Sequence, residues 1–470
     1  MLTTSAESYP QLEETGKQTS SASAGGLVRR AAKGTAWTVA SYVAAQLLRF
    51  VSNILLSRLL VPQYFGVMTL LNTVITGMNL FSDLGLAPGI IRSKRGDDPV
   101  FLNTAWTIQA FRGIGLWLIC CCLAWPIAAF YGESQLKTLV PVLSLCLVIS
   151  GFASTNLATA ERHLEVRKLA GMEFTVQFTQ LIFTLVWAWL QPSIWALVAG
   201  RIFSEVAHLY LGYRLLPSQR NRFAWNREAV RELVGFGRWV FLSTALTFLS
   251  TQSDRLILGK LVSFRTLGLY GIAFAFADLP RQLIISFCSR IAFPFVSKFA
   301  QMDRDDFLMV ALRYRRIVLF CAAALLAVIV NTADLGLVWI YDRRYHDASW
   351  MIPILALGLW HTLLYSTISP FLWAIGRPRY HAVGYTLSAA LMFTAVPLAF
   401  HLWGLAGAVW AIAFSDLPVY FANLYGGWRQ NFFTLFQDFQ ATFLFAALCG
   451  LLFLARTLAG IDLPHPIALH

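Results

Sequence analysis

Long apolar stretches separated by short polar segments run along almost the whole chain. Each stretch holds about 20 residues, the length that a helix needs to cross the hydrocarbon core of a bilayer. The pattern predicts an all-α polytopic membrane protein with about 13 spanning helices. The predicted spans are 36–60, 66–91, 104–130, 138–158, 172–190, 194–213, 236–259, 268–295, 316–340, 350–373, 380–402, 404–425 and 440–458.

Polar residues within the first stretch recur three and four positions apart, so they share one face of a helix. They are Tyr42, Gln46, Arg49 and Asn53. An arginine at the middle of a spanning helix costs about 2.5–3.5 kcal/mol on insertion scales, and such residues usually face a wet cavity or a counter-charge. The stripe therefore predicts a protein that passes a charged molecule through a membrane.

Composition excludes an ordinary soluble protein, because 57% of the residues are hydrophobic and only 13% are charged. The formal charge of +13 is compatible with nucleic-acid binding. However, the basic residues gather in alternate inter-span segments, as the positive-inside rule describes. We therefore expect a cytoplasmic N-terminus and no nucleic-acid partner.

No catalytic, metal or cofactor motif stands out in the sequence. All seven cysteines fall inside apolar spans and lack metal-ligand spacing with a nearby histidine. Walker A, HExxH and GxSxG patterns are absent from the sequence, and no large loop carries paired acidic residues. We predict a protein that is not an enzyme and that has no cofactor.

The two halves of the chain match when the sequence is shifted by 202 residues without a gap. The shift places Trp37 on Trp239, Leu56 on Leu258, Arg58 on Lys260, Leu59 on Leu261 and Gly66 on Gly268. A parallel repeat of this kind predicts two pseudo-symmetric six-helix lobes around a central cavity. The predicted divisions are a disordered cytoplasmic tail (1–28), an N-lobe (29–213), a basic cytoplasmic linker (214–235), a C-lobe (236–427) and an extra C-terminal helix with a tail (428–470).

The same shift maps Arg49 onto Thr251 and Asn53 onto Arg255, so each lobe carries one arginine in its first polar stripe. The two stripes predict a cationic cleft. Arg49 is the first candidate for binding an anion, because a guanidinium fork matches phosphate or carboxylate oxygens. The alternative for Arg49 is a structural ion pair, and Arg255, which lies beside Asp254, can instead extend to the membrane surface.

Other charged residues in the spans are candidates for substrate binding, coupling or gating. Asp278 and Arg281 lie three apart and can pair on one helix face. Arg201 and Glu205 lie four apart and can neutralise each other, although a carboxylate near His208 also suits a proton-coupled step. Asp83 and Arg112 lie nearer the cytoplasmic ends of their spans, and Asp254 lies near the outer end of its span.

Several helix-end segments resemble a known family. They are Ser57–Val67 (SRLLVPQYFGV), Ser82–Leu86 (SDLGL), Ala160–Ala170 (AERHLEVRKLA), Ser253–Phe274 (SDRLILGKLVSFRTLGLYGIAF) and Trp373–Tyr380 (WAIGRPRY). Their order and spacing resemble those of the bacterial polysaccharide transporters, the oligosaccharide flippases of the multidrug/oligosaccharidyl-lipid/polysaccharide exporter superfamily. The extra C-terminal helix departs from the even helix count that is usual in that family.

The resemblance implies alternating access in the bacterial inner membrane, with an undecaprenyl-pyrophosphate-linked oligosaccharide as substrate for exopolysaccharide, capsule or O-antigen synthesis. It implies that Arg49, Arg255 and Arg281 meet the pyrophosphate or acidic sugars, beside Gln46 and Asn53. Membrane lipids surround the protein, and a polysaccharide polymerase and glycosyltransferases are the expected partners. The alternatives are a drug or cation antiporter of the same superfamily, in which acidic residues would dominate the cavity, and a membrane polysaccharide polymerase.

Overall fold

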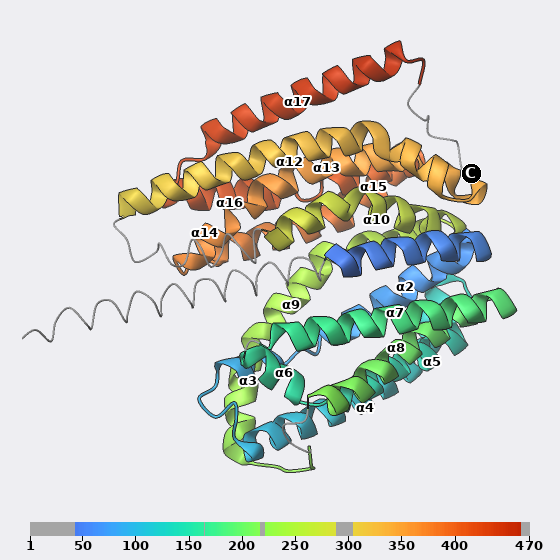
Figure 1. Ribbon diagram of the computed structural model, residues 1–470, viewed down its shortest axis with the longest axis vertical. Helices are drawn as coiled ribbons and strands as arrows, with labels where there is room; N and C mark the ends of the chain where they lie inside the picture. The colour runs from blue at the N-terminus through green and yellow to red at the C-terminus, as the bar shows by residue number, and fades with distance from the viewer. Residues whose placement is uncertain (1–42, 164, 217–220, 288–303, 462–470) are drawn as a thin grey trace, which may run out of the picture.

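The computed structural model describes residues 43–163, 165–216, 221–287 and 304–461, and its regular elements are all helical in these ranges (Figure 1). The predicted tail at 1–28 and Tyr42 lie outside the described residues. The first described helix covers residues 43–59. The others are α2 (Pro62–Leu80), α3 (Leu86–Arg92), α4 (Pro99–Tyr131), α5 (Leu136–Gly151), α6 (Asn156–Arg162), α7 (Val166–Leu190), α8 (Ile194–Leu215), α9 (Arg227–Leu261), α10 (Phe264–Phe287), α12 (Arg304–Ile340), the 3₁₀ helix η2 (Arg343–Ala348), α13 (Met351–Ser366), α14 (Ser369–Ala374), α15 (Arg379–Phe414), α16 (Leu417–Arg429) and α17 (Leu435–Leu458).

The helices form two bundles, which confirms the predicted fold class. In Figure 1, α4, α5, α7 and α8 lie on one side of α9, and α10, α12, α13, α15 and α17 lie on the other. We call these the N-bundle, which also holds helix 43–59 and α2, and the C-bundle. Within the described residues, seven helical segments are long and apolar enough to cross a membrane, or eight if α5 and α6 form one bent span.

Every predicted span contains helix, but several spans are broken. The predicted span 66–91 divides into α2 and α3 at Gly85, whose φ of 59° is left-handed. The span 138–158 divides into α5 and α6, which meet at a bend of 59°. α15 runs through a kink at Gly404, where two predicted spans adjoin. Apolar length alone cannot reveal such breaks, because it measures composition and not chain direction.

The predicted repeat is visible where α2 meets α10. Helix 43–59 and α9 end 202 residues apart, and so do the first residues of α2 and α10, Pro62 and Phe264. A Cβ added at Gly66 would overlap the carbonyl oxygen of Phe264, and one added at Gly268 would overlap the carbonyl oxygen of Pro62. Such a reciprocal contact between equivalent residues is what a twofold pseudo-symmetry axis between the two helices produces.

The long helix α9 joins the two bundles. Its N-cap Asn226 accepts a hydrogen bond from the backbone N–H of Ala229 (3.0 Å). Ala229 and Leu233 are buried in a small core with residues of α3 and α4, including Ile90 and Phe101. Part of the predicted linker 214–235 is therefore helical and packed against the N-bundle, and the predicted boundary at 235/236 falls inside one continuous helix.

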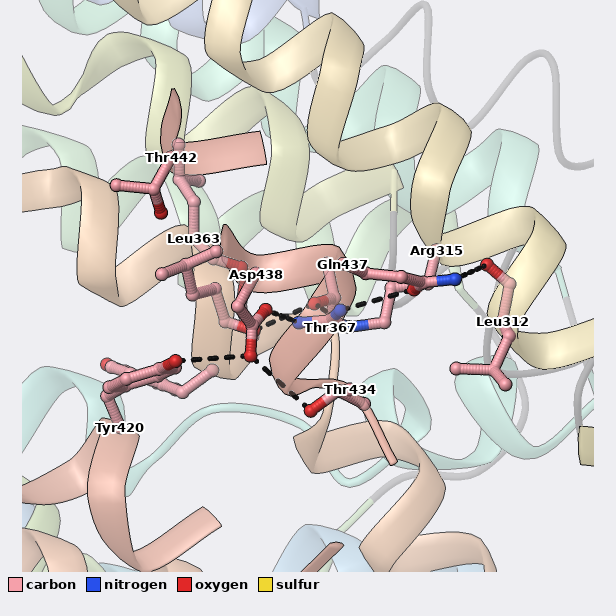
Figure 2. Close-up of polar contacts among 12 residues, drawn as sticks. Leu312, Arg315, Leu363, Thr367, Tyr420, Thr434, Gln437, Asp438 and Thr442 are labelled. Atoms are coloured by element: carbon pink, nitrogen blue, oxygen red, sulfur yellow. Dashed lines mark hydrogen bonds and ion pairs between the residues drawn. The ribbon is translucent and has the colours of Figure 1, made fainter. Parts of the chain in front are cut away.

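The C-terminal helix α17 is fastened to α12 by two buried ion pairs. Near one end, Arg315 of α12 pairs with Asp438 of α17, and Tyr420 donates a hydrogen bond to the same carboxylate (3.1 Å; Figure 2). Near the other end, the guanidinium of Arg456 makes two hydrogen bonds to Asp334 (2.8 and 2.5 Å). The side chains of both pairs are at most 5% exposed.

The order of the charges fixes the direction of α17. On α12 the arginine precedes the aspartate, whereas on α17 the aspartate precedes the arginine. The two helices run parallel, so each charge meets its opposite. An antiparallel arrangement would instead bury arginine against arginine and aspartate against aspartate, which is costly in a medium of low dielectric constant.

Candidate functional site

A polar cavity of about 740 Å³ lies mainly within the N-bundle. Its walls come from helix 43–59, α2, α7 and α8, and α10 of the C-bundle adds Gly268, Gly271 and Ile272 to the lining. The titratable side chains that line it are Arg49, Glu173, Arg201, Glu205 and His208. Amide and hydroxyl side chains complete the polar lining: Ser52, Asn53, Thr69, Asn72, Thr76, Gln177, Gln180, Thr184 and Ser204.

Arg49 is the basic residue of this cavity that has no carboxylate within 4 Å among the described residues. With the Gln177 amide oriented to satisfy both of its polar atoms, Nη2 of Arg49 donates to its oxygen (3.1 Å). The Gln177 nitrogen then donates to the carbonyl oxygen of Ala45 (3.2 Å), which ties α7 to helix 43–59. Asn53 lines the same cavity, whereas Gln46 is not among its lining residues.

The two basic residues of α8 that line the cavity are each paired with a carboxylate. Nη2 of Arg201 lies 2.6 Å from Oε1 of Glu205, which is the pairing that the sequence indicated. Nε2 of His208 lies 3.3 Å from Oε1 of Glu173, across the gap to α7. The cavity thus has a formal charge of zero with His208 neutral and +1 with it protonated, which is less positive than the predicted cationic cleft.

The signal for the α7 wall was present in the sequence but was not used. Glu173, Gln177, Gln180 and Thr184 are spaced four, three and four apart, and all of them line the cavity. This is the same stripe that identified Arg49. An intramembrane arginine does not mark this stripe, because α7 carries none on that face.

The other two predicted anion-binding arginines do not reach this cavity. Arg281 pairs with Asp278 as predicted, and it lines a separate pocket of about 80 Å³ in the C-bundle, together with Asp254. Nη1 of Arg255 donates to Gln252 (2.5 Å), and its guanidinium carbon lies 5.0 Å from the ring centre of Phe274. Among the described residues, the two polar stripes therefore line separate pockets, and Arg255 and Arg281 are engaged by Gln252 and Asp278.

The predicted gating residues Asp83 and Arg112 meet at the break between α2 and α3. Asp83 accepts a hydrogen bond from the backbone N–H of Gly85 (2.8 Å), and Arg112 donates to Ser82 (3.1 Å) and to the side chain of Asn79 (3.1 Å). Neither residue lines the large cavity. Their contacts stabilise the turn that ends α2.

The C-bundle is hydrogen-bonded to the end of helix 43–59 through η2. The buried hydroxyl of Tyr345 donates to the carbonyl oxygen of Leu60 (2.8 Å). Nη2 of Arg344 donates to the carbonyls of Arg58 (2.9 Å) and Ser57 (3.2 Å). Asp342 orients this arginine through a hydrogen bond of 2.8 Å, and that bond, with the backbone N–H of Arg344, keeps the pKa of Asp342 below its usual value.

The N-bundle makes the reciprocal contact at the same end. Nζ of Lys260, the repeat equivalent of Arg58, donates to the carbonyl oxygen of Phe130 (2.5 Å), and the hydroxyl of Tyr131 donates to that of Leu256 (3.4 Å). We call these two sets of contacts the inter-bundle clasp. It joins the bundles at the end of the molecule that the charge distribution predicts to face the periplasm.

The chain is similar in sequence to proteins of bacterial polysaccharide assembly. The chain is 21% identical over 350 residues to the succinoglycan biosynthesis transport protein ExoT of Rhizobium meliloti, covering 73% of this chain and 69% of that protein. It is 23% identical over 270 residues to the lipopolysaccharide biosynthesis protein WzxC of Escherichia coli, covering 56% and 54%.

Solved structures share the fold. The lipid II flippase MurJ, in an inward closed conformation, aligns with a TM-score of 0.71 at 13% identity, over 90% of this chain and 93% of that one. An inward-facing multidrug resistance transporter of the MATE family aligns with a TM-score of 0.64 at 13% identity, over 85% and 95%. This is the architecture of multi-pass membrane transporters, as predicted.

The family model described as polysaccharide biosynthesis protein matches residues 55–350, which is more than half of the chain. This match agrees with the resemblance found in the helix-end segments, and ExoT and the structural neighbours are transporters, in line with the prediction that the protein is not an enzyme. The chain belongs to the polysaccharide biosynthesis protein family.

Proposed function

We propose that this protein is a flippase that moves an undecaprenyl-pyrophosphate-linked oligosaccharide from the cytoplasmic to the periplasmic leaflet of a bacterial inner membrane. The names of ExoT and WzxC, a transport protein and a lipopolysaccharide biosynthesis protein, support a role in exopolysaccharide or lipopolysaccharide assembly. The fold shared with MurJ, a lipid II flippase, supports a lipid-linked substrate. Glycosyltransferases would supply the substrate at the cytoplasmic face, and a polymerase would consume it at the periplasmic face.

The observation that carries this proposal is Arg49 in the polar cavity without a carboxylate partner among the described residues. A guanidinium offers several donors in one plane and matches the oxygens of a phosphate. In the proposed mechanism, Arg49 holds the diphosphate and Asn53 contacts the sugars, while the lipid tail stays in the bilayer. The cavity replaces the water that a charged head group would lose in hydrocarbon.

A drug or cation antiporter is the second candidate, because Glu173 and Glu205 also line the cavity. Their carboxylates are engaged by His208 and Arg201, which weakens them as binding groups for a cation. The relatives named for polysaccharide assembly favour the flippase.

The test replaces Arg49 by alanine and measures surface polysaccharide, together with lipid-linked oligosaccharide retained on the cytoplasmic leaflet. Hydrogen bonds to a charged group contribute about 1.5–3 kcal/mol, so transport should fall by about tenfold or more. Arg58→Ala is the matched control, because this exposed arginine lies on the same helix but does not line the cavity. Normal export by Arg49→Ala at normal membrane abundance would remove the proposed anion site.

A further inference from the structure

The two carboxylates of the cavity already pair with basic side chains that a bound anion could otherwise contact. Glu205 engages Arg201 within α8 (2.6 Å), and Glu173 engages His208 from α7 (3.3 Å). The Glu173 side chain is 54% exposed, and both Arg49 and Arg201 lie within electrostatic reach of it. Arg49 itself is held by the neutral amide of Gln177.

These five groups are the charged and titratable side chains that face the cavity. Helix 43–59 contributes Arg49, α7 contributes Glu173, and α8 contributes Arg201, Glu205 and His208. The described lining residues of α2 and α10 are uncharged. A compensating change of charge within this lining must therefore come from one of these five groups.

A diphosphate brings at least two negative charges into a cavity with almost no net positive charge. If both glutamates remained ionised, the incoming phosphates would face two like charges in a site partly walled off from solvent, where repulsion is weakly screened. Protonation of Glu173 removes one of these charges and releases His208. The Nε2–H group of His208, which donates to Glu173 while that carboxylate is ionised, can then turn to a phosphate oxygen.

We propose that Glu173 is an internal counter-ion which the substrate displaces, and that it takes up a proton from water when the diphosphate binds. Substrate and proton then enter the cavity together. Glu173 then controls when an anion binds, because its negative charge weakens anion binding until the carboxylate is neutralised. This inference rests on the proposed function, since it assumes a diphosphate beside Arg49.

The experiment measures binding of farnesyl diphosphate, a short isoprenoid diphosphate, to the purified full-length protein in detergent between pH 6 and pH 8. Uptake of one proton makes the Kd rise with pH by up to about tenfold per pH unit. Glu173→Gln should bind more tightly than wild type at pH 8, by about threefold or more, and its Kd should depend less on pH. The ligand's own titration is the same for both proteins, so the difference between them reports Glu173.

Two further variants separate the possible outcomes. Glu161→Gln, an exposed position on α6, is the matched control and should bind with the wild-type pH profile. Arg49→Ala should lose binding at every pH. If wild type binds through Arg49 but Glu173→Gln binds equally or more weakly with an unchanged pH profile, the counter-ion role is wrong and the anion site stands. If wild type does not bind the diphosphate, both proposals are overturned.

Discussion

Removing one hydroxyl oxygen from the inter-bundle clasp should open one end of the protein. Opening this end would separate helix 43–59 from η2, because the clasp joins them. Tyr345 is fully buried there, and its hydroxyl is the donor to the carbonyl oxygen of Leu60. We expect Tyr345→Phe to favour the open arrangement, because the lost hydroxyl contributes only while the clasp is closed.

The size of the effect follows from the burial of the carbonyl. Removing the donor leaves the Leu60 oxygen unsatisfied in the closed state, whereas water can reach it in the open state. An unsatisfied buried polar group costs about 1–3 kcal/mol, which shifts the equilibrium between the two arrangements about 5- to 150-fold. Arg344→Gln should shift it less, because the Arg344 side chain is 39% exposed and water screens its bonds to the carbonyls.

Thiol accessibility measures this shift directly. A cysteine introduced at Thr69, which lines the cavity on α2, would be labelled from the clasp end by a membrane-impermeant reagent. The seven native cysteines would first be replaced. If opening limits the reaction, the labelling rate should rise in Tyr345→Phe by the same factor as the open population.

The neighbouring ring provides the control. Tyr341 packs against Tyr345 with ring centres 6.1 Å apart, and Tyr341→Phe removes a hydroxyl without removing a contact of the clasp. This variant should label at the wild-type rate. If Tyr345→Phe folds normally and labels no faster than Tyr341→Phe, the clasp does not hold this end closed.

Two further predictions concern helix packing, and thermal unfolding in detergent checks both. Arg315→Ala should destabilise the protein by about 3–5 kcal/mol, because it leaves the buried Asp438 carboxylate unpaired; exchanging the two residues (Arg315→Asp with Asp438→Arg) should restore part of the loss, and no recovery would contradict the pairing argument. Gly66→Ala and Gly268→Ala should each lower the unfolding temperature to a similar extent, because each Cβ would overlap a carbonyl of the other bundle, whereas Gly115→Ala, in open space, should not.

Sequence patterns predicted which residues share a helix face, but not what that face meets. The stripe rule placed Arg49 and Asn53 correctly on one wall of the cavity, and the ungapped shift placed Gly66 on its contact partner Gly268. The spacing of Asp278 and Arg281 also predicted their ion pair, because pairing three residues apart satisfies both charges locally. It did not indicate that Arg281 lines a pocket separate from the cavity beside Arg49, and the substrate role that the resemblance implies for Arg281 stays a prediction.

The contacts of the clasp could not be predicted from the sequence, for a different reason. Tyr345 and Leu60 lie 285 positions apart, and the acceptor is a backbone carbonyl, which every residue carries. In the sequence, basic residues near span ends, such as Arg344 and Lys260, indicate topology only. Their hydrogen bonds to helix-end carbonyls follow from groups that every helix end leaves unsatisfied, but the partner depends on tertiary structure.

The two halves of the repeat have the same residue where the bundles touch and different residues where the cavity lies. Gly66 and Gly268 are both glycine because each must admit a carbonyl of the other bundle. Arg49, by contrast, corresponds to Thr251, and the C-bundle pocket beside Thr251 holds about 80 Å³ against about 740 Å³ for the cavity beside Arg49. Close packing permits few residues at the pseudo-symmetry axis, whereas the cavity walls are free to diverge. A substrate that rests at Arg49 would therefore move with the N-bundle, while the C-bundle supplies the surface against which the clasp opens and closes.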